Sequence, residues 1–258
     1  MIQIFKILYL CTLIFGIFNC SSTKVGLDST IEERFDQAIK FLENGKYLRA
    51  QDEFSSILIQ GSGTEYGDDA QFYLGEAYFL NKEYILAISE YEKLTRKMAF
   101  SPFVEEARFK ICEAYRIESP SYYHDQTYTE KALERFQEFL DDFPNSSYKN
   151  EVLSSINILR NKVGEKEFET GILYMKMEEY ESARMVFQRV NDIYYDTDVA
   201  DDTILWTIKA YARTFNLDDA KSHLLKYEKI LKENNLYDEA LISISEANKM
   251  VTKNGKSK

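Results

Sequence analysis

The sequence has few residues that break helices or bind metals. Its 258 residues include only 3 prolines, 10 glycines, 3 cysteines and 2 histidines. Few breakers, together with abundant Glu, Lys, Leu and Ala, favour helices. Neither His124 nor His223 has a Cys, Asp or Glu partner at recognisable metal spacing. We therefore expect no metal site and no cofactor.

Motifs that carry catalysis or bind nucleic acid are also missing. The sequence has no Gly-rich phosphate loop, no GxSxG elbow and no supported Ser/His/Asp arrangement. Acidic residues are abundant, so paired catalytic carboxylates remain an alternative, but nothing in the sequence points to them. The net charge is −11, and the basic residues cluster only in the C-terminal tail, so the chain would repel nucleic acid phosphates. These absences favour a protein that is not an enzyme and does not bind nucleic acid.

The N-terminus has the pattern of a targeting segment. Residues 1–19 place one lysine before an apolar run that is short for a membrane span but has the length of a signal-peptide core. Cys20 follows, and the stretch Ile17-Phe18-Asn19-Cys20 resembles a bacterial lipobox. We expect a lipoprotein signal peptide over 1–19, lipid attachment at Cys20 and a flexible tether over 20–30. The alternative is an uncleaved signal anchor, or an ordinary secretory signal with a chance Cys.

An internal repeat is the strongest signal in the sequence. A small or apolar residue, an aromatic residue, an Ala and an aromatic residue or Leu recur at spacings of 3, 9 and 4. The sets are Ala38, Phe41, Ala50, Phe54; Gly75, Tyr78, Ala87, Tyr91; Gly171, Tyr174, Ala183, Phe187; Ile208, Tyr211, Ala220, Leu224; and, with eight inserted residues, Cys112, Tyr115, Ala132, Phe136. The pattern predicts helix-turn-helix units whose small residue lets two helices approach closely. It resembles the tetratricopeptide repeat.

The spacing of the units predicts the architecture. The period is 37 residues from Ala50 to Ala87 and again from Ala183 to Ala220. We predict an all-α tetratricopeptide-repeat solenoid over 31–252, followed by a basic, disordered tail over 253–258. The five units cover about 31–64, 68–101, 103–146, 164–198 and 201–232.

Two further helical segments lie outside these units. The residues from Tyr148 to Val163 have apolar side chains at helical spacing. They predict an extra helix before repeat four or, alternatively, an N-terminal extension of that repeat's first helix. Leu236 to Val251 predicts a helix that caps the array at its C-terminal end, as solenoid ends require.

The fifth position of each first helix carries a large apolar residue. These residues are Phe35, Phe72, Phe109, Phe168 and Leu205. Because tetratricopeptide arrays present the first helix to a concave surface, this stripe is a candidate groove for an aromatic-rich peptide or a partner helix. Polar contacts that orient a bound peptide would come from Glu76, Glu113 and Arg116. The alternative, weighed equally, is that the stripe packs between successive repeats.

The insertion in repeat three is a second candidate interaction site. It lies between Tyr115 and Ala132 and contains Tyr122 and Tyr123. Long exposed loops often bind partners. The alternative is a loop that folds back and packs its tyrosines on the array. Cys112, the only thiol in the body of the chain, lies in an apolar helical stretch and is expected to be buried and inert.

A more specific resemblance begins at the end of repeat three. The segment TEKALERFQEFLDDFPNSSY, which ends at Tyr148, is similar to the BamD (ComL-type) lipoproteins of bacterial outer-membrane β-barrel assembly. Those proteins have a Pro-Asn-Ser-x-Tyr turn after an inserted loop. The stretch from Gly171 to Tyr174 and the following EEYESARMVFQRV also fit, whereas Tyr195-Asp196-Thr197 lacks the proline of the family's turn. The resemblance covers roughly residues 20–232.

The resemblance implies a scaffold that is lipid-anchored at the periplasmic face of the outer membrane. It would bind a BamA-type barrel assembly subunit, other assembly subunits and unfolded outer-membrane protein precursors. Arg189 matches a basic position in the family's fourth repeat, on the side that meets the partner; the alternative is a solvated helix arginine. The alternative function is a periplasmic repeat lipoprotein that acts as an adaptor for cell-wall enzymes.

Overall fold

The computed structural model describes residues 29–61 and 63–255, and every regular element in this part of the chain is an α-helix. The predicted signal peptide and Cys20 lie outside the described residues. The helices are α2 Ile31–Glu43, α3 Tyr47–Gly61, α4 Gly67–Leu80, α5 Tyr84–Lys97, α6 Val104–Glu118, α7 Thr127–Asp142, α8 Lys149–Lys176, α9 Tyr180–Ile193, α10 Ala200–Arg213, α11 Leu217–Lys226, α12 Glu228–Glu233 and α13 Tyr237–Gly255. None of them is both long and apolar enough to cross a membrane.

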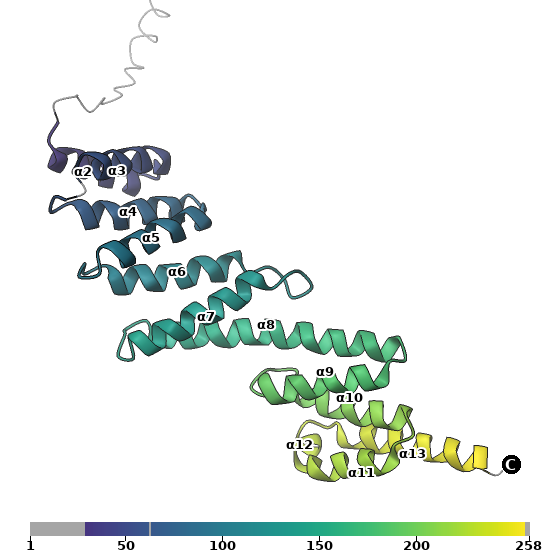
Figure 1. Ribbon diagram of the computed structural model, residues 1–258. Helices are drawn as coiled ribbons and strands as arrows, with labels where there is room; N and C mark the ends of the chain where they lie inside the picture. Colours follow the sequence, from purple (N-terminus) through teal and green to yellow (C-terminus); the bar gives the residue numbers. More distant parts are fainter. Residues whose placement is uncertain (1–28, 62, 256–258) are drawn as a thin grey trace, which may run out of the picture.

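The helices form antiparallel pairs that stack as a staircase along one direction (Figure 1). The pairs α2/α3, α4/α5, α6/α7, α8/α9 and α10/α11 correspond to the five repeats, and α13 packs on α10 and α11 at the end of the array. This arrangement confirms the predicted all-α tetratricopeptide-repeat solenoid with a C-terminal capping helix. The short helix α12 was not predicted.

Small residues let the two helices of a pair approach, as the repeat pattern predicted. A methyl group at Gly75 of α4 would lie 2.5 Å from a ring carbon of Tyr91 in α5. A methyl group at Gly171 of α8 would come even closer to the ring of Phe187 in α9. Real Cβ atoms essentially never approach so closely. A larger residue at either position would collide with the aromatic ring beside it, so the close packing of the two helices requires glycine.

Helix α8 corrects one prediction. The separate helix expected before repeat four is absent from the described residues, because Lys149–Lys176 forms a single helix of 28 residues, about 42 Å long at 1.5 Å per residue. No proline interrupts this stretch. Gly164 lies within the helix, and a methyl group there would lie 2.9 Å from Thr197 Oγ1, so glycine leaves room for a later turn. The alternative of an N-terminal extension is therefore the correct one.

The extended helix α8 joins the two parts of the array. Val152 and Leu159 of its first half are buried with Phe136 of α7. Ile172 of its second half is buried with Phe187 of α9. In Figure 1, α2 to α7 lie on one side of α8 and α9 to α13 lie on the other.

The ends of the array also differ slightly from prediction. Thr30, which we assigned to the tether, is the N-cap of α2, and its Oγ1 accepts a hydrogen bond of 3.2 Å from the backbone N–H of Glu33. The carboxylate of Glu33 accepts a bond from the Thr30 N–H in return, which completes a capping box. At the other end, α13 continues to Gly255, so residues 253–255 are helical and not part of a disordered tail.

Candidate functional site

The structure places the predicted phenylalanine stripe inside the array. Phe72 and Phe109 are only 3 % and 6 % exposed, so they cannot line an open groove. Phe35 is partly buried and lies 5.8 Å from Phe54 and 5.9 Å from Tyr73, measured between ring centroids. The groove assignment is therefore wrong for Phe72 and Phe109, and the alternative of packing between repeats describes all three rings. The physical reason is that the next pair brings its own aromatic rings against each position.

The Pro144 to Tyr148 turn supplies one of these rings. Tyr148 stacks on Phe109 with ring centroids 4.2 Å apart and an angle of 11° between the rings. The Tyr148 N–H also bonds the Ser146 hydroxyl at 3.0 Å, and the Tyr148 carbonyl accepts from Val152 in the first turn of α8. The turn that carries the family resemblance thus closes repeat three and starts α8.

The polar groups predicted beside the stripe are paired within the array. Glu76 accepts hydrogen bonds from the Tyr91 hydroxyl and from Lys110 Nζ, the latter at 3.0 Å. Burial and the nearby Glu76 carboxylate raise the pKa of Tyr91, so its hydroxyl stays a donor. Glu113 is buried between Arg116, whose Nε lies 2.8 Å away, and the Ser155 hydroxyl at 3.4 Å. These groups connect neighbouring helices and do not face an open groove.

Hydrogen bonds to its backbone carbonyls hold the inserted loop of repeat three in place, while part of its aromatic surface stays exposed. The side-chain amide of Gln126 donates to three loop carbonyls, those of Ser121, Tyr122 and His124, at 2.9 to 3.3 Å. Lys166 of α8 also reaches the His124 carbonyl, at 2.9 Å. Tyr123 is nevertheless 68 % exposed, while Tyr122 is half-buried. The loop folds back as the alternative predicted, yet it still presents Tyr123.

Arg189 of α9 is available for a contact. Its side chain is 56 % exposed, and one guanidinium nitrogen lies 3.6 Å from a carboxylate oxygen of Glu167 in α8. A pair this exposed and this long contributes little stability. The side chain can therefore turn toward a partner at small cost.

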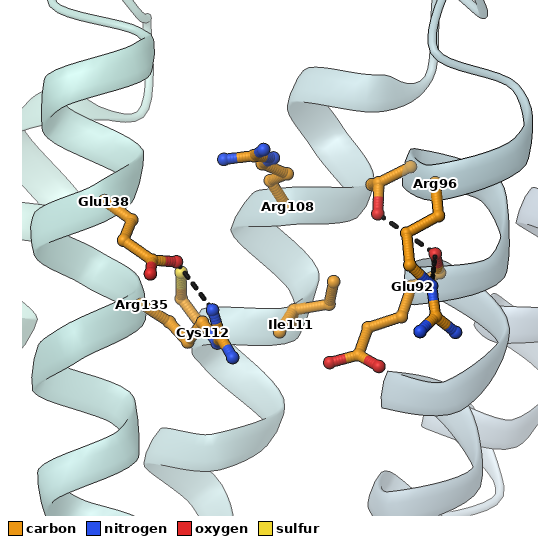
Figure 2. A pocket seen from close by; sticks show the side chains of 8 residues that line it. Glu92, Arg96, Arg108, Ile111, Cys112, Arg135 and Glu138 are labelled. Atoms are coloured by element: carbon orange, nitrogen blue, oxygen red, sulfur yellow. Dashed lines mark hydrogen bonds and ion pairs between the residues drawn. The ribbon is translucent and has the colours of Figure 1, made fainter.

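A charged pocket of about 300 Å³ lies between α5, α6 and α7 (Figure 2). Arg96, Arg108 and Arg135 line it together with Glu92 and Glu138. Two of the arginines are already paired: Arg135 lies 2.7 Å from Glu138, and Arg108 pairs with Asp142. We name this feature the arginine pocket.

Cys112 also lines the arginine pocket (Figure 2), where its side chain is only 1 % exposed. Burial raises the pKa of the thiol, which keeps it protonated and unreactive near neutral pH. The expectation of a buried Cys112 is confirmed. Within the described residues, no group of three or more His, Cys, Asp or Glu side chains is placed to hold a metal ion.

A second pocket, of about 370 Å³, lies where the end of α8 and the start of α9 meet α10 and α13. We call it the C-terminal pocket. Its main side chains are Met175, Trp206, Lys209, Arg213, Phe215 and Met250. Sequence reasoning missed it because its walls come from segments up to 75 residues apart. The signals that could have found it are Trp206, the only tryptophan, and Phe215 in a tight turn.

Comparisons with known proteins find a family and relatives with similar sequences. Residues 28–226 match the model of the family YfiO, described as outer membrane lipoprotein. The outer membrane protein assembly factor BamD of Rickettsia prowazekii is 25 % identical over 225 residues, which cover 84 % of this chain and 85 % of the relative. BamD of Vibrio cholerae is 22 % identical and covers 79 % and 89 % in the same order.

Solved structures with similar folds are more distant. A tetratricopeptide repeat protein from Parabacteroides merdae is 14 % identical with a TM-score of 0.37, covering 88 % of this chain and 75 % of that one. The TPR2AB-domain–pHSP90 complex of yeast Sti1 is 14 % identical with a TM-score of 0.45, covering 88 % and 86 %. The family match, which spans most of the described array, is decisive: the chain belongs to the YfiO family of outer membrane lipoproteins.

Proposed function

We propose that this protein is a non-enzymatic scaffold subunit of the machinery that assembles β-barrel proteins in the outer membrane. In this role it binds a BamA-type subunit, other assembly subunits and unfolded barrel precursors. The observation that carries the proposal is the family match over residues 28–226, together with assembly-factor relatives that align over most of their length.

The fold supports a binding role. Stacked helix pairs bury one face of each helix in a shared core and leave the outer faces free for partners. Arg189 and Tyr123 are both exposed beside α8, because Glu167 of α8 pairs with Arg189 and the adjacent Lys166 bonds the loop carbonyl that follows Tyr123. A rigid helix of the length of α8 fixes the relative position of these surfaces.

We further propose that Cys20 carries the lipid that anchors the protein to the periplasmic face of the outer membrane. The leader, the lipobox-like stretch and the family's description support this step. Replacing Cys20 with Ser should move the protein from the membrane fraction to the soluble periplasmic fraction and abolish incorporation of labelled palmitate. Unchanged membrane association and labelling of the C20S variant would contradict the anchor.

The test of the scaffold role is affinity purification in mild detergent through a C-terminal tag, with mass spectrometry of the recovered proteins. We expect a BamA-type subunit at near-stoichiometric yield. Charge reversal by Arg189→Glu should reduce that yield about tenfold, because it puts repulsion where a positive side chain would pair. Lys229→Glu is the matched control, since Lys229 is 87 % exposed on α12 and its ion pair with Glu233, at 3.8 Å, lies within the same helix.

Two outcomes would contradict parts of the proposal. Recovery of cell-wall enzymes without a barrel-bearing subunit would replace the assembly scaffold with the adaptor function. Equal yields from the Arg189→Glu and Lys229→Glu variants would remove Arg189 from the contact while leaving the scaffold role in place.

A further inference from the structure

The C-terminal pocket has the shape and lining of a site for a large side chain. Ala212 of α10 and Ala247 of α13 line it, and each is only 5 % exposed, so small residues leave room between the helices. The ring of Trp206 also lines the space. Phe215 and Met250 line it too and are 49 % and 50 % exposed. Pockets with apolar walls and a few polar groups are the usual form of binding sites.

The backbone at Phe215 is unfavourable for a phenylalanine. Phe215 has a φ of 57°, in the left-handed region where a Cβ atom is crowded. The turns that follow α2, α4, α8 and α12 use the same conformation, at Gly45, Lys82, Glu178 and Asn235. Glycine or asparagine fits this position best. Because the Phe215 ring stays half exposed, its own burial does not offset the strain, so the turn alone does not account for an aromatic residue here.

The charges of the pocket favour one kind of ligand. Lys209 is committed: its Nζ lies 4.1 Å from the Trp206 ring centroid and 2.7 Å from a carboxylate oxygen of Glu239. Arg213 has no ion pair or side-chain hydrogen bond with any residue in the described part of the chain, so its planar fork is open to a carboxylate. Glu246 of α13 also lines the pocket and would repel a ligand that is acidic throughout.

We propose that the C-terminal pocket binds a segment of a partner protein through one large apolar side chain, with a neighbouring acidic residue paired to Arg213. The volume suits a single anchoring side chain, and binding of this kind concentrates its energy in one buried aromatic or aliphatic group. This site does not depend on the assembly role, and it is separate from Arg189, which does not line the pocket.

The single tryptophan makes the proposal directly measurable. Trp206 is the only tryptophan in the chain, so fluorescence of the full-length protein in detergent, excited at a wavelength where its 19 tyrosines absorb little, reports on the surroundings of Trp206. The probes are end-blocked eight-residue peptides that carry one Phe, Tyr or Leu next to one Asp in a Ser/Gly background. We expect a saturable change in fluorescence with these peptides and none when the apolar residue is Ala. Replacing the Asp with Asn should weaken binding about tenfold, or about 1.4 kcal/mol.

Two variants connect the signal to the pocket. Phe215→Asn suits the left-handed turn, so the protein should stay folded while peptide affinity falls at least about tenfold. Phe100→Asn is the matched control, because Phe100 is fully exposed in another turn, and it should leave the affinity unchanged. Arg213→Gln should remove the preference for the Asp peptide over the Asn peptide.

Three results would overturn the proposal. One is the absence of a saturable change with any of the apolar–acidic peptides at millimolar concentration. Another is equal peptide affinity of the Phe215→Asn and Phe100→Asn variants. The third is fluorescence that depends on protein concentration without peptide, with a dimer seen by sedimentation, because the occupant would then be a second copy. None of these measurements involves co-purification, so they leave the scaffold role unaffected.

Discussion

The first three helix pairs and the last pair differ in what their aromatic residues contact. In the first three, Phe35, Phe72 and Phe109 point into the joints between pairs, and the stack of Phe109 on Tyr148 closes the third joint. In the fourth pair, the corresponding Phe168 packs against Phe187, with ring centroids 5.9 Å apart. In the fifth pair, the corresponding Leu205 is buried, and the neighbouring Trp206 lines the C-terminal pocket. The stripe position therefore packs in every pair, whereas Trp206, one residue further along α10, lines a pocket.

The largest effect on stability should come from removing an aromatic ring that packs between the N-terminal helix pairs. Phe109→Ala deletes a buried ring that contacts Phe139 and Tyr148, and we expect it to lower the free energy of unfolding by about 3–5 kcal/mol. Urea unfolding followed by circular dichroism measures the loss.

Trp206 fluorescence in the same experiment reports on the C-terminal part of the array. Because α8 packs on both α7 and α9, we expect the fluorescence and circular dichroism transitions to shift together. A fluorescence midpoint that stays at the wild-type urea concentration would show that the two parts unfold independently.

The glycine joints allow a matched comparison of the two parts. Gly75→Ala and Gly171→Ala each push a methyl group into a buried ring, and each should cost about 1–3 kcal/mol. Gly171→Ala should cost more, since Phe187 approaches more closely than Tyr91 does. Gly63→Ala is the control, because no atom lies within 4 Å of the position of the new methyl group. Equal unfolding midpoints for all three variants would disprove the close-approach explanation.

A smaller effect is the pH dependence that His223 contributes in the C-terminal part. Burial lowers the pKa of His223 to about 4, and Lys226 adds to the shift. Its Nε2 is buried without a hydrogen-bond partner in the described structure. Tyr211 and Tyr227 face the imidazole. Because the unfolded state binds the proton at higher pH, the free energy of unfolding should fall as pH drops from about 6.5 to about 4.

We expect this loss to be about 1–2 kcal/mol, after allowing for partial exposure of the imidazole to solvent. His223→Gln cannot titrate, so it should show a smaller decline over the same range than the wild-type protein. Thermal unfolding at half-unit pH steps measures the difference. Parallel curves for the two proteins would mean that His223 is not the titrating group.

The smallest effect concerns the strained turn. Phe215→Asn should raise the free energy of unfolding by about 0.5–1 kcal/mol, because asparagine tolerates the left-handed conformation better than phenylalanine. Urea unfolding followed by Trp206 fluorescence measures the change. A loss of stability would show that the Phe215 ring contributes packing that outweighs its backbone strain.

Several features of the protein could be read from the residues alone. The recurring small residue, aromatic residue and alanine predicted the helix pairs and their order, because helical periodicity and close approach depend on local spacing. Gly75 and Gly171 were correctly assigned to close contacts with the second helix. The Pro144 to Tyr148 turn correctly indicated the family. The burial of Cys112 followed from its apolar neighbours.

Tertiary structure alone decided which of these residues are exposed. The sequence left Phe72 and Phe109 open between groove and core, because the rings that cover them, Phe103 and Tyr148, come from the next unit. The sequence also did not decide whether α8 would be one helix or two. The C-terminal pocket was out of reach of any local pattern, since Met175, Trp206 and Met250 meet only after three helices pack. Periodicity fixes which residues share a helix face, whereas burial depends on which distant segment covers that face.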